Sequence, residues 1–335
     1  MILRKPPYFD TFTCIAGACP DSCCKEWAVQ VDDASAEFYR NLPGPLGDRL
    51  RRVLTEEDGD TVMAIENGRC PMWRSDGLCR IQAELGEEAL CATCRDFPRL
   101  RHDYGDFMEL GLELSCPEAA RLILSAPYAP RVCVEIPGGE EPEYDQEAMD
   151  ILLSSRETVL SILSDPTYTV PQALALGLLY GYQVQSQLDS GEEQSFDAAS
   201  ALDSVRGFLK APDHRALPDF FAGLEILTEA WRQRLARPTS GAWTEEYRAL
   251  AQYFVERYWL QAVSDYDLYS RIKFITASCV LIHLLGGNMA ETAQLYSKEI
   301  ENNLDNVEAI LDAAYTHPAF TDEKLLGLLL TVSGT

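Results

Sequence analysis

The sequence predicts a mainly α protein, built from a cysteine-rich N-terminal module with short strands and an all-helical C-terminal region. Two observations lead to this prediction. Nine of the eleven cysteines lie in the first 116 residues, whereas apolar residues recur at spacings of three and four through residues 145–331. Residues 137–143 are rich in Gly, Pro and Glu, which is typical of a linker. The predicted domains are therefore 1–136 and 144–335.

Short elements separated by turns are expected in the first region. Residues 1–25 should form an extended segment followed by the first cysteines, because prolines and Gly17 disfavour a regular element. Expected short strands cover residues 26–31, 61–65 and 107–114. Residues 56–60 should form an acidic turn. Capping residues and proline positions predict helices over residues 32–41, 46–54, 81–85, 87–94 and 117–125.

The second region is expected to be helical almost throughout, since Pro, Gly or Asp marks most of the breaks between its periodic segments. We find no fixed-period repeat that would indicate a solenoid. The predicted helices cover residues 145–164, 170–188, 197–210, 217–236, 243–262, 266–285, 288–299, 303–314 and 322–331.

The overall composition limits which classes of function are expected. The chain has 335 residues and 47% apolar residues, enough for a proper core without disulfide staples. Its formal net charge of −25 argues against nucleic acid as a partner and suits a cationic one, or serves solubility alone. No apolar leader follows the first charges, and no apolar stretch reaches the roughly 20 residues of a membrane span. We therefore expect a cytoplasmic protein, without a membrane, in which thiols stay reduced.

The cysteine spacing points to metal. Nine cysteines in one loop-rich region are too many for ordinary buried thiols, and thiolates bind soft or borderline metals well. The pair Cys91-x2-Cys94 lets two sulfurs chelate one site from a single turn. We therefore predict a metal-binding module. Its candidate ligands are Cys14, Cys19, Cys23, Cys24, Cys70, Cys79, Cys91, Cys94 and Cys116.

Two metal chemistries stay open on these spacings. Four-cysteine zinc sites often pair two C-x2-C knuckles, and this chain has one. Irregular spacings from separate loops favour an iron–sulfur cluster, in particular [4Fe–4S]. Nine thiols suffice for two four-cysteine sites with one left over, or for one site plus spectators. Because side chains of neighbouring residues diverge, at most one of Cys23 and Cys24 should bind a given metal.

Three stretches, in fixed order, resemble a known family. Residues 5–27 open with Lys-Pro-Pro-Tyr-Phe and contain the adjacent cysteines. Residues 67–82 contain Asn-Gly-Arg-Cys-Pro-Met and Asp-Gly-Leu-Cys. Residues 85–99 contain Cys-x2-Cys-Arg-x-Phe-Pro-Arg. Over about residues 1–120 the chain resembles the flagellin lysine-N-methylase family, and its cysteine module is also similar to a broader class of zinc- or iron-chelating domains.

The resemblance implies a protein-lysine N-methyltransferase that modifies flagellin, or another lysine-bearing protein, with S-adenosylmethionine as methyl donor. It also implies an iron–sulfur cluster held by the cysteines. The residues themselves reveal no catalytic or donor-binding residue: no glycine-rich loop follows a strand, and the Cys-x3-Cys-x2-Cys triplet of radical enzymes is absent. The alternatives are a non-enzymatic zinc- or iron-binding adaptor and an iron–sulfur redox protein.

Overall fold

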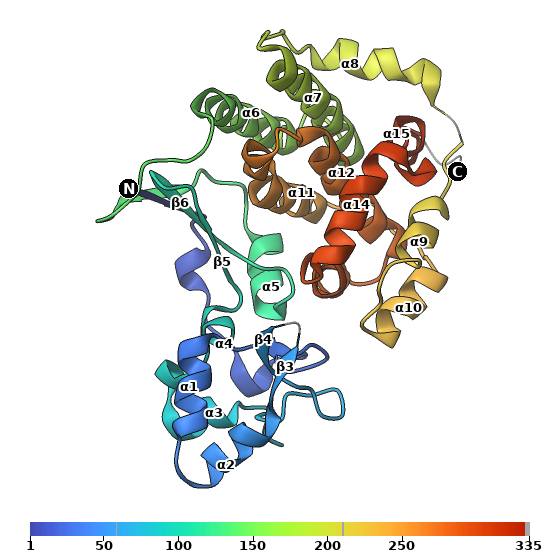
Figure 1. The fold of residues 1–335 in the computed structure, drawn as a ribbon. Helices are drawn as coiled ribbons and strands as arrows, with labels where there is room; N and C mark the ends of the chain where they lie inside the picture. Colours follow the sequence, from blue (N-terminus) through green and yellow to red (C-terminus); the bar gives the residue numbers. More distant parts are fainter. Residues whose placement is uncertain (58, 210, 332–335) are drawn as a thin grey trace.

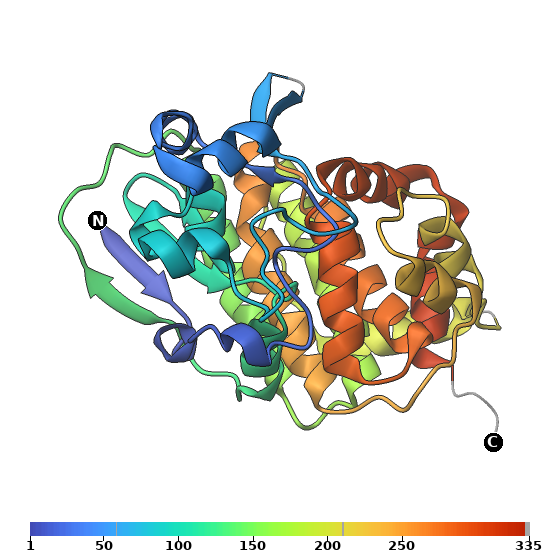
Figure 2. The same cartoon turned by 90° about the horizontal axis from the view of Figure 1, so that it is seen from below.

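The computed structural model describes residues 1–57, 59–209 and 211–331. Within these residues it contains fifteen α-helices and seven short strands, which confirms the mainly α prediction. Beyond β7 (Val132–Glu135) every described regular element is helical, as expected. Figure 1 shows a small N-terminal lobe beneath a larger helical region, and Figure 2 shows the same arrangement from below.

A small lobe forms around a three-stranded antiparallel sheet of order β2-β4-β3. The predicted acidic turn at residues 56–60 is wrong at its start, because Leu54–Glu57 pairs with the following strand, β4. The helix predicted over residues 32–41 is confirmed, with the Asp32 side chain accepting from the Ser35 amide as an N-cap. The elements of this lobe are β2 (Val29–Gln30), α1 (Asp33–Asn41), α2 (Gly44–Val53), β3 (Leu54–Glu57), β4 (Asp60–Met63), α3 (Arg80–Leu85) and α4 (Ala92–Asp96).

A second sheet joins the start of the chain to residues more than 100 positions later. Its order is β5-β6-β1-β7, where β1 (Ile2–Lys5) runs parallel to β6 (Phe107–Leu112) and antiparallel to β7. The other edge is β5 (Arg99–Asp103). The strand predicted at residues 107–114 is confirmed, whereas β1, β5 and β7 were not predicted. The helix α5 (Pro117–Ser125) follows, with proline at its first position.

The helical region packs around α12 (Leu268–Leu285), in which nearly every residue is buried, including polar ones. Among the described helices, α12 alone is long and apolar enough to cross a membrane, but 94% of that window is buried inside the protein. The other helices are α6 (Gln146–Ser164), α7 (Val170–Ser190), α8 (Ala198–Val205), α9 (Ala216–Phe221), α10 (Glu229–Ala236), α11 (Glu246–Tyr258), α13 (Met289–Tyr296), α14 (Leu304–Thr316) and α15 (Asp322–Leu330).

Two of the predicted helices are shorter in the structure than the sequence predicted. The segment predicted over residues 217–236 is two helices, because the backbone amides of Leu227 and Thr228 are bound by the buried carboxylate of Glu299. The segment predicted over residues 197–210 ends as a helix at Val205, and residue 210 lies outside the described residues.

The chain has two hydrophobic cores. The smaller core lies within the lobe, around Tyr39, Leu50 and Met72, and includes the buried Cys70 and Cys91. The larger core joins the helical region to Phe12, β6 and α5. The division into 1–136 and 144–335 stays a prediction, but the apolar packing groups the second sheet and α5 with the helices that follow.

Candidate functional site

Six of the nine candidate cysteines gather in the lobe. Cys24 shares thiol hydrogen bonds with Cys23 and Cys70, and Cys91 shares one with Cys94. Cys79 lies within electrostatic reach of both sets, because Cys23 and Cys91 each raise the pKa of its thiol, after burial, which raises it most. We call these residues the six-cysteine group: Cys23, Cys24, Cys70, Cys79, Cys91 and Cys94.

The other three candidates, Cys14, Cys19 and Cys116, lie near one another at the start of α5. Burial, together with the neighbouring Cys19 and Cys14, raises the pKa of Cys116 to about 11. Cys19 also lies within electrostatic reach of Cys23, so this trio adjoins the six-cysteine group. All eleven cysteines are free thiols in the described part of the chain.

Backbone amides lie near several of these sulfurs. The amides of Ile81 and Gln82 lower the pKa of Cys79 against the larger effect of burial, although Cys79, which precedes the first residue of α3, makes no side-chain capping hydrogen bond. Cys91 precedes the first residue of α4, also without a side-chain capping hydrogen bond, and the amide of Cys94 lowers its pKa. Such N–H groups stabilise thiolates rather than neutral thiols, so they lower a cysteine's pKa. The hydrogen bond from Cys94 likewise holds the pKa of Cys91 below its usual range and raises that of Cys94.

The gathered sulfurs are the kind of donor that binds soft or borderline metals as thiolates. However, in residues 1–57, 59–209 and 211–331 no set of three or more His, Cys, Asp or Glu side chains is arranged to hold a metal ion. The metal-binding character of the module and its nine ligands therefore stay predictions. Ligation would require the thiols of the six-cysteine group to converge on one centre.

A buried lysine fastens the cysteine-bearing loop to the helical region. Lys298 lies on a π-helical turn, Ser297–Glu301, and its side chain is 1% exposed. Its Nζ lies 2.8 Å from a Glu26 oxygen, 3.2 Å from an Asp21 oxygen and 4.7 Å from the centre of the Trp27 ring. The position of residues 19–27, with three candidate ligands, is thus set by a helix almost 280 residues later.

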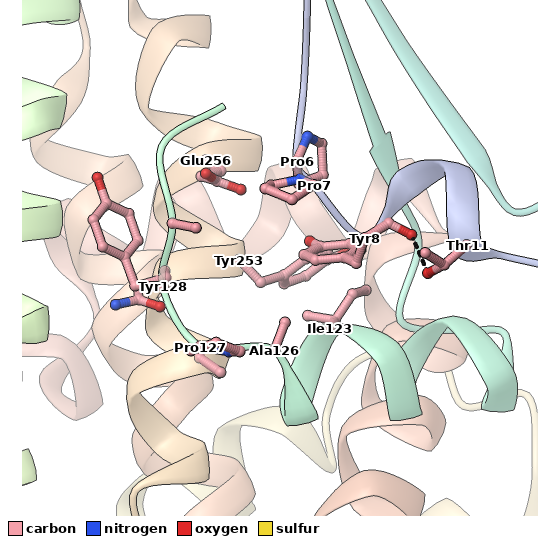
Figure 3. A pocket seen from close by; sticks show the side chains of 13 residues that line it. Pro6, Pro7, Tyr8, Thr11, Ile123, Ala126, Pro127, Tyr128, Tyr253 and Glu256 are labelled. Carbon is pink, nitrogen blue, oxygen red and sulfur yellow. Dashed lines mark hydrogen bonds between the residues drawn. The ribbon is translucent and has the colours of Figure 1, made fainter. Parts of the chain in front are cut away.

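A cavity of about 310 Å³ lies between the N-terminal segment, the end of α5 and α11. Figure 3 shows the side chains that line it, with Glu256 on one side, Tyr128 on another and Ile123 on α5 below. Tyr8 and Tyr253 complete the aromatic wall. Burial, followed by the Glu256 charge, holds the pKa of Tyr8 well above its usual value of 10.0, so its hydroxyl stays protonated.

Sequence reasoning missed this cavity. Tyr253 and Glu256 are three positions apart on one helix, a spacing that places them on one face, but nothing local connects them to Tyr8 or Tyr128. The cavity also lies at the opposite end of α5 from Cys116. The nine residues of α5 separate Cys116 from Ala126 at the cavity, a distance of roughly 15 Å.

Comparisons with known proteins bear on this arrangement. The chain is 32% identical over 138 residues to the flagellar biosynthetic protein FliU of Salmonella muenchen, a match covering 38% of this chain and 79% of FliU. It is also 32% identical over 138 residues to the lysine-N-methylases of Salmonella typhimurium and Salmonella choleraesuis. That match covers 33% of each, so it spans about a third of their length.

No family model matches the chain, and no solved structure resembles it closely enough to count as a match. The match to FliU nevertheless extends over more than two thirds of that protein at 32% identity, and the sequence motifs point to the same relatives. The chain therefore belongs to the flagellin lysine-N-methylase family.

Proposed function

We propose that the protein is a cytoplasmic protein-lysine N-methyltransferase that methylates flagellin with S-adenosylmethionine as donor. The observation that carries this proposal is the match to FliU and to two proteins named lysine-N-methylase. The net charge of −25 supports it, because an acidic surface steers a lysine-bearing protein toward the enzyme.

Lysine methylation sets two requirements on the chain. The ε-amine must be neutral when it attacks, and it must be aimed in line with the sulfonium methyl group. A partly apolar site with a nearby carboxylate meets the first requirement, because burial favours the neutral amine and a carboxylate can accept its proton. The described strands form two small sheets, largely antiparallel, so the donor would bind outside a Rossmann-type fold.

We further propose that the six-cysteine group holds an iron–sulfur cluster, with a four-cysteine zinc site as the alternative. The gathered thiols exceed the four that a [4Fe–4S] centre uses, and the pKa of Cys91 among them lies below its usual range. Bound there, a cluster would supply a redox centre or tie together the loops of the lobe. The cavity at the far end of α5 is a separate feature from this centre.

One experiment tests the activity. Protein purified without oxygen is incubated with flagellin and S-adenosylmethionine, and flagellin is then analysed by mass spectrometry. We expect additions of about 14 Da per methyl group on lysine peptides. Unmodified flagellin in the presence of an intact metal centre would contradict the proposal. A colourless zinc protein without affinity for the donor would instead identify an adaptor.

The matched variants are Cys91→Ser and Cys133→Ser. Cys91 is buried in the smaller core and paired with Cys94, whereas Cys133 is exposed on β7. If the cysteine centre supports methylation, Cys91→Ser lowers the methyl count and Cys133→Ser leaves it unchanged. Equal activity of both variants would separate methylation from the cysteine centre.

A further inference from the structure

The cavity between the N-terminal segment, α5 and α11 has the composition of a site for a small organic cation. Its volume of about 310 Å³ lies at the lower end of the roughly 300–1,000 Å³ range of small-molecule sites. This size suits one long side chain better than a whole nucleoside-containing cofactor. Three tyrosines, three prolines and Ile123 supply its walls, and Glu256 is the acidic residue that lines it.

Hydrogen bonds on the side away from the cavity fix the ring of Tyr253 in the aromatic wall. The hydroxyl of Tyr253 donates to Glu301 at 3.0 Å and accepts from Arg257 at 2.6 Å. Both partners are largely buried, so the ring of Tyr253 has little freedom to move. Fixed aromatic rings attract cations through the negative charge on their faces, and they contact an aliphatic chain well.

Three carboxylates and two arginines form a charged network beside the cavity. Arg156 is bound by both oxygens of Glu109 at 2.7 and 2.8 Å. Arg131 lies 3.3 Å from Glu256 and 3.9 Å from Glu109. A third carboxylate, Glu157, accepts from the hydroxyl of Tyr128 at 3.5 Å. Glu256 is the carboxylate of this network that lines the cavity, and its ion-pair partner Arg131 lies outside the lining.

We propose that this cavity binds an alkylammonium group, with Glu256 facing the cation and the rings of Tyr8, Tyr128 and Tyr253 around its aliphatic chain. Resting on the proposed function, the occupant is the side chain of the lysine to be methylated. In that role Glu256 would also lie where a proton from the ammonium could be accepted.

Binding of two peptides tests the proposal with the full chain. One is a flagellin peptide with a single lysine, and the other replaces that lysine by norleucine, which lacks the amine. We expect calorimetry to show that wild type prefers the lysine peptide by at least about tenfold, which corresponds to about 1.4 kcal/mol. Glu256→Gln should abolish this preference. Glu246→Gln, an exposed carboxylate on the same helix, should retain it.

A second variant covers the case in which Glu256→Gln does not fold. Ala249 also lines the cavity, and Ala249→Leu fills it without changing charge. This variant should weaken both peptides, because it removes the space for the aliphatic chain. An unchanged lysine preference in folded Glu256→Gln, or unchanged affinity for both peptides in folded Ala249→Leu, overturns the cavity assignment. Loss of S-adenosylhomocysteine binding in Glu256→Gln while peptide binding persists also overturns it.

The outcomes also separate the cavity from the proposed function. If wild type and Glu256→Gln methylate flagellin equally, the cavity assignment fails while the activity stands. If wild type does not methylate flagellin, but its lysine preference depends on Glu256, the cavity assignment stands and the activity fails.

Discussion

Burial of the Glu109–Arg156 pair should make it far more important for stability than an exposed pair of the same geometry. Each side chain is 3% exposed, and the guanidinium binds both carboxylate oxygens at 2.7 and 2.8 Å. The pair joins β6 to α6, and therefore joins the second sheet to the helical region. Glu109→Gln removes the negative charge while nearly preserving shape, and it leaves Arg156 without its counter-ion.

Breaking a buried ion pair costs about 3–5 kcal/mol, because the remaining charge stays out of water. A glutamine oxygen still accepts one hydrogen bond, so we expect a loss of about 3 kcal/mol of unfolding free energy. The control is Glu118→Gln. Arg121 binds both oxygens of Glu118 at 2.6 and 2.9 Å, but the Arg121 side chain is 61% exposed. Solvent should limit the cost there to about 1 kcal/mol or less.

Urea unfolding followed by tryptophan fluorescence measures both losses. The difference should depend on pH. Burial alone would raise the pKa of Glu109, but the hydrogen bonds and charge of Arg156 lower it below its usual 4.5. A lowered native pKa contributes stability that is fully present above pH 4.5 and disappears as pH falls through the native value. The deficit of Glu109→Gln should therefore shrink in acid. Equal losses for the two variants at pH 7 would refute the role assigned to burial.

Three further predictions follow from the described geometry. Cys91→Ser should lower the amount of metal bound per chain, whereas Cys133→Ser should not. The measurement is elemental analysis after anaerobic purification. Full metal content in Cys91→Ser would exclude Cys91 as a ligand. Burial raises the pKa of Glu113 above 4.5, so the free energy of unfolding should fall as pH rises from 4.5 through the raised value. Glu113→Gln should remove this fall, which is measured by comparing unfolding at pH 5 and pH 8. The same fall in the variant as in wild type would contradict the burial argument. A Cβ on Gly181 would lie 2.7 Å from an Ile272 carbon, whereas one on Gly177 would make an ordinary 3.5 Å contact. Thermal unfolding should therefore show that Gly181→Ala lowers the free energy of unfolding by about 1 kcal/mol, whereas Gly177→Ala raises it by up to about 1 kcal/mol. A change of the same sign in both variants would contradict this reading of the contacts.

Helices were predictable because their signals are local. The Asp32 cap, the proline that begins α5 and the apolar periodicity of α6 each lie within the segment that they define. The unpredicted strands β1 and β7 have four residues each, and both pair with partners more than 100 positions away. A short strand is specified largely by its neighbours, and the sequence does not state which neighbours those are.

The same distinction applies to the site. Cysteine spacing predicted nine candidate ligands, and the structure gathers six of them in one lobe. The cavity could not be predicted, because Tyr8, Tyr128 and Glu256 meet only after the sheet has joined the start of the chain to α5 and α11. The break between α9 and α10 has a similar origin, since the carboxylate that binds its amides belongs to Glu299, about 70 residues later.

The central place of β1 in its sheet has a consequence for biosynthesis. Residues 2–5 leave the ribosome long before residues 107–112 and 132–135, the two segments that flank them. At about 5–20 residues per second, the nascent strand waits on the order of ten seconds with both edges unsatisfied. During that interval Ile2 and Leu3 are open to chaperones or to strands of other chains. Residues 2–5 thus acquire their hydrogen-bonding partners only after more than 100 further residues have been translated.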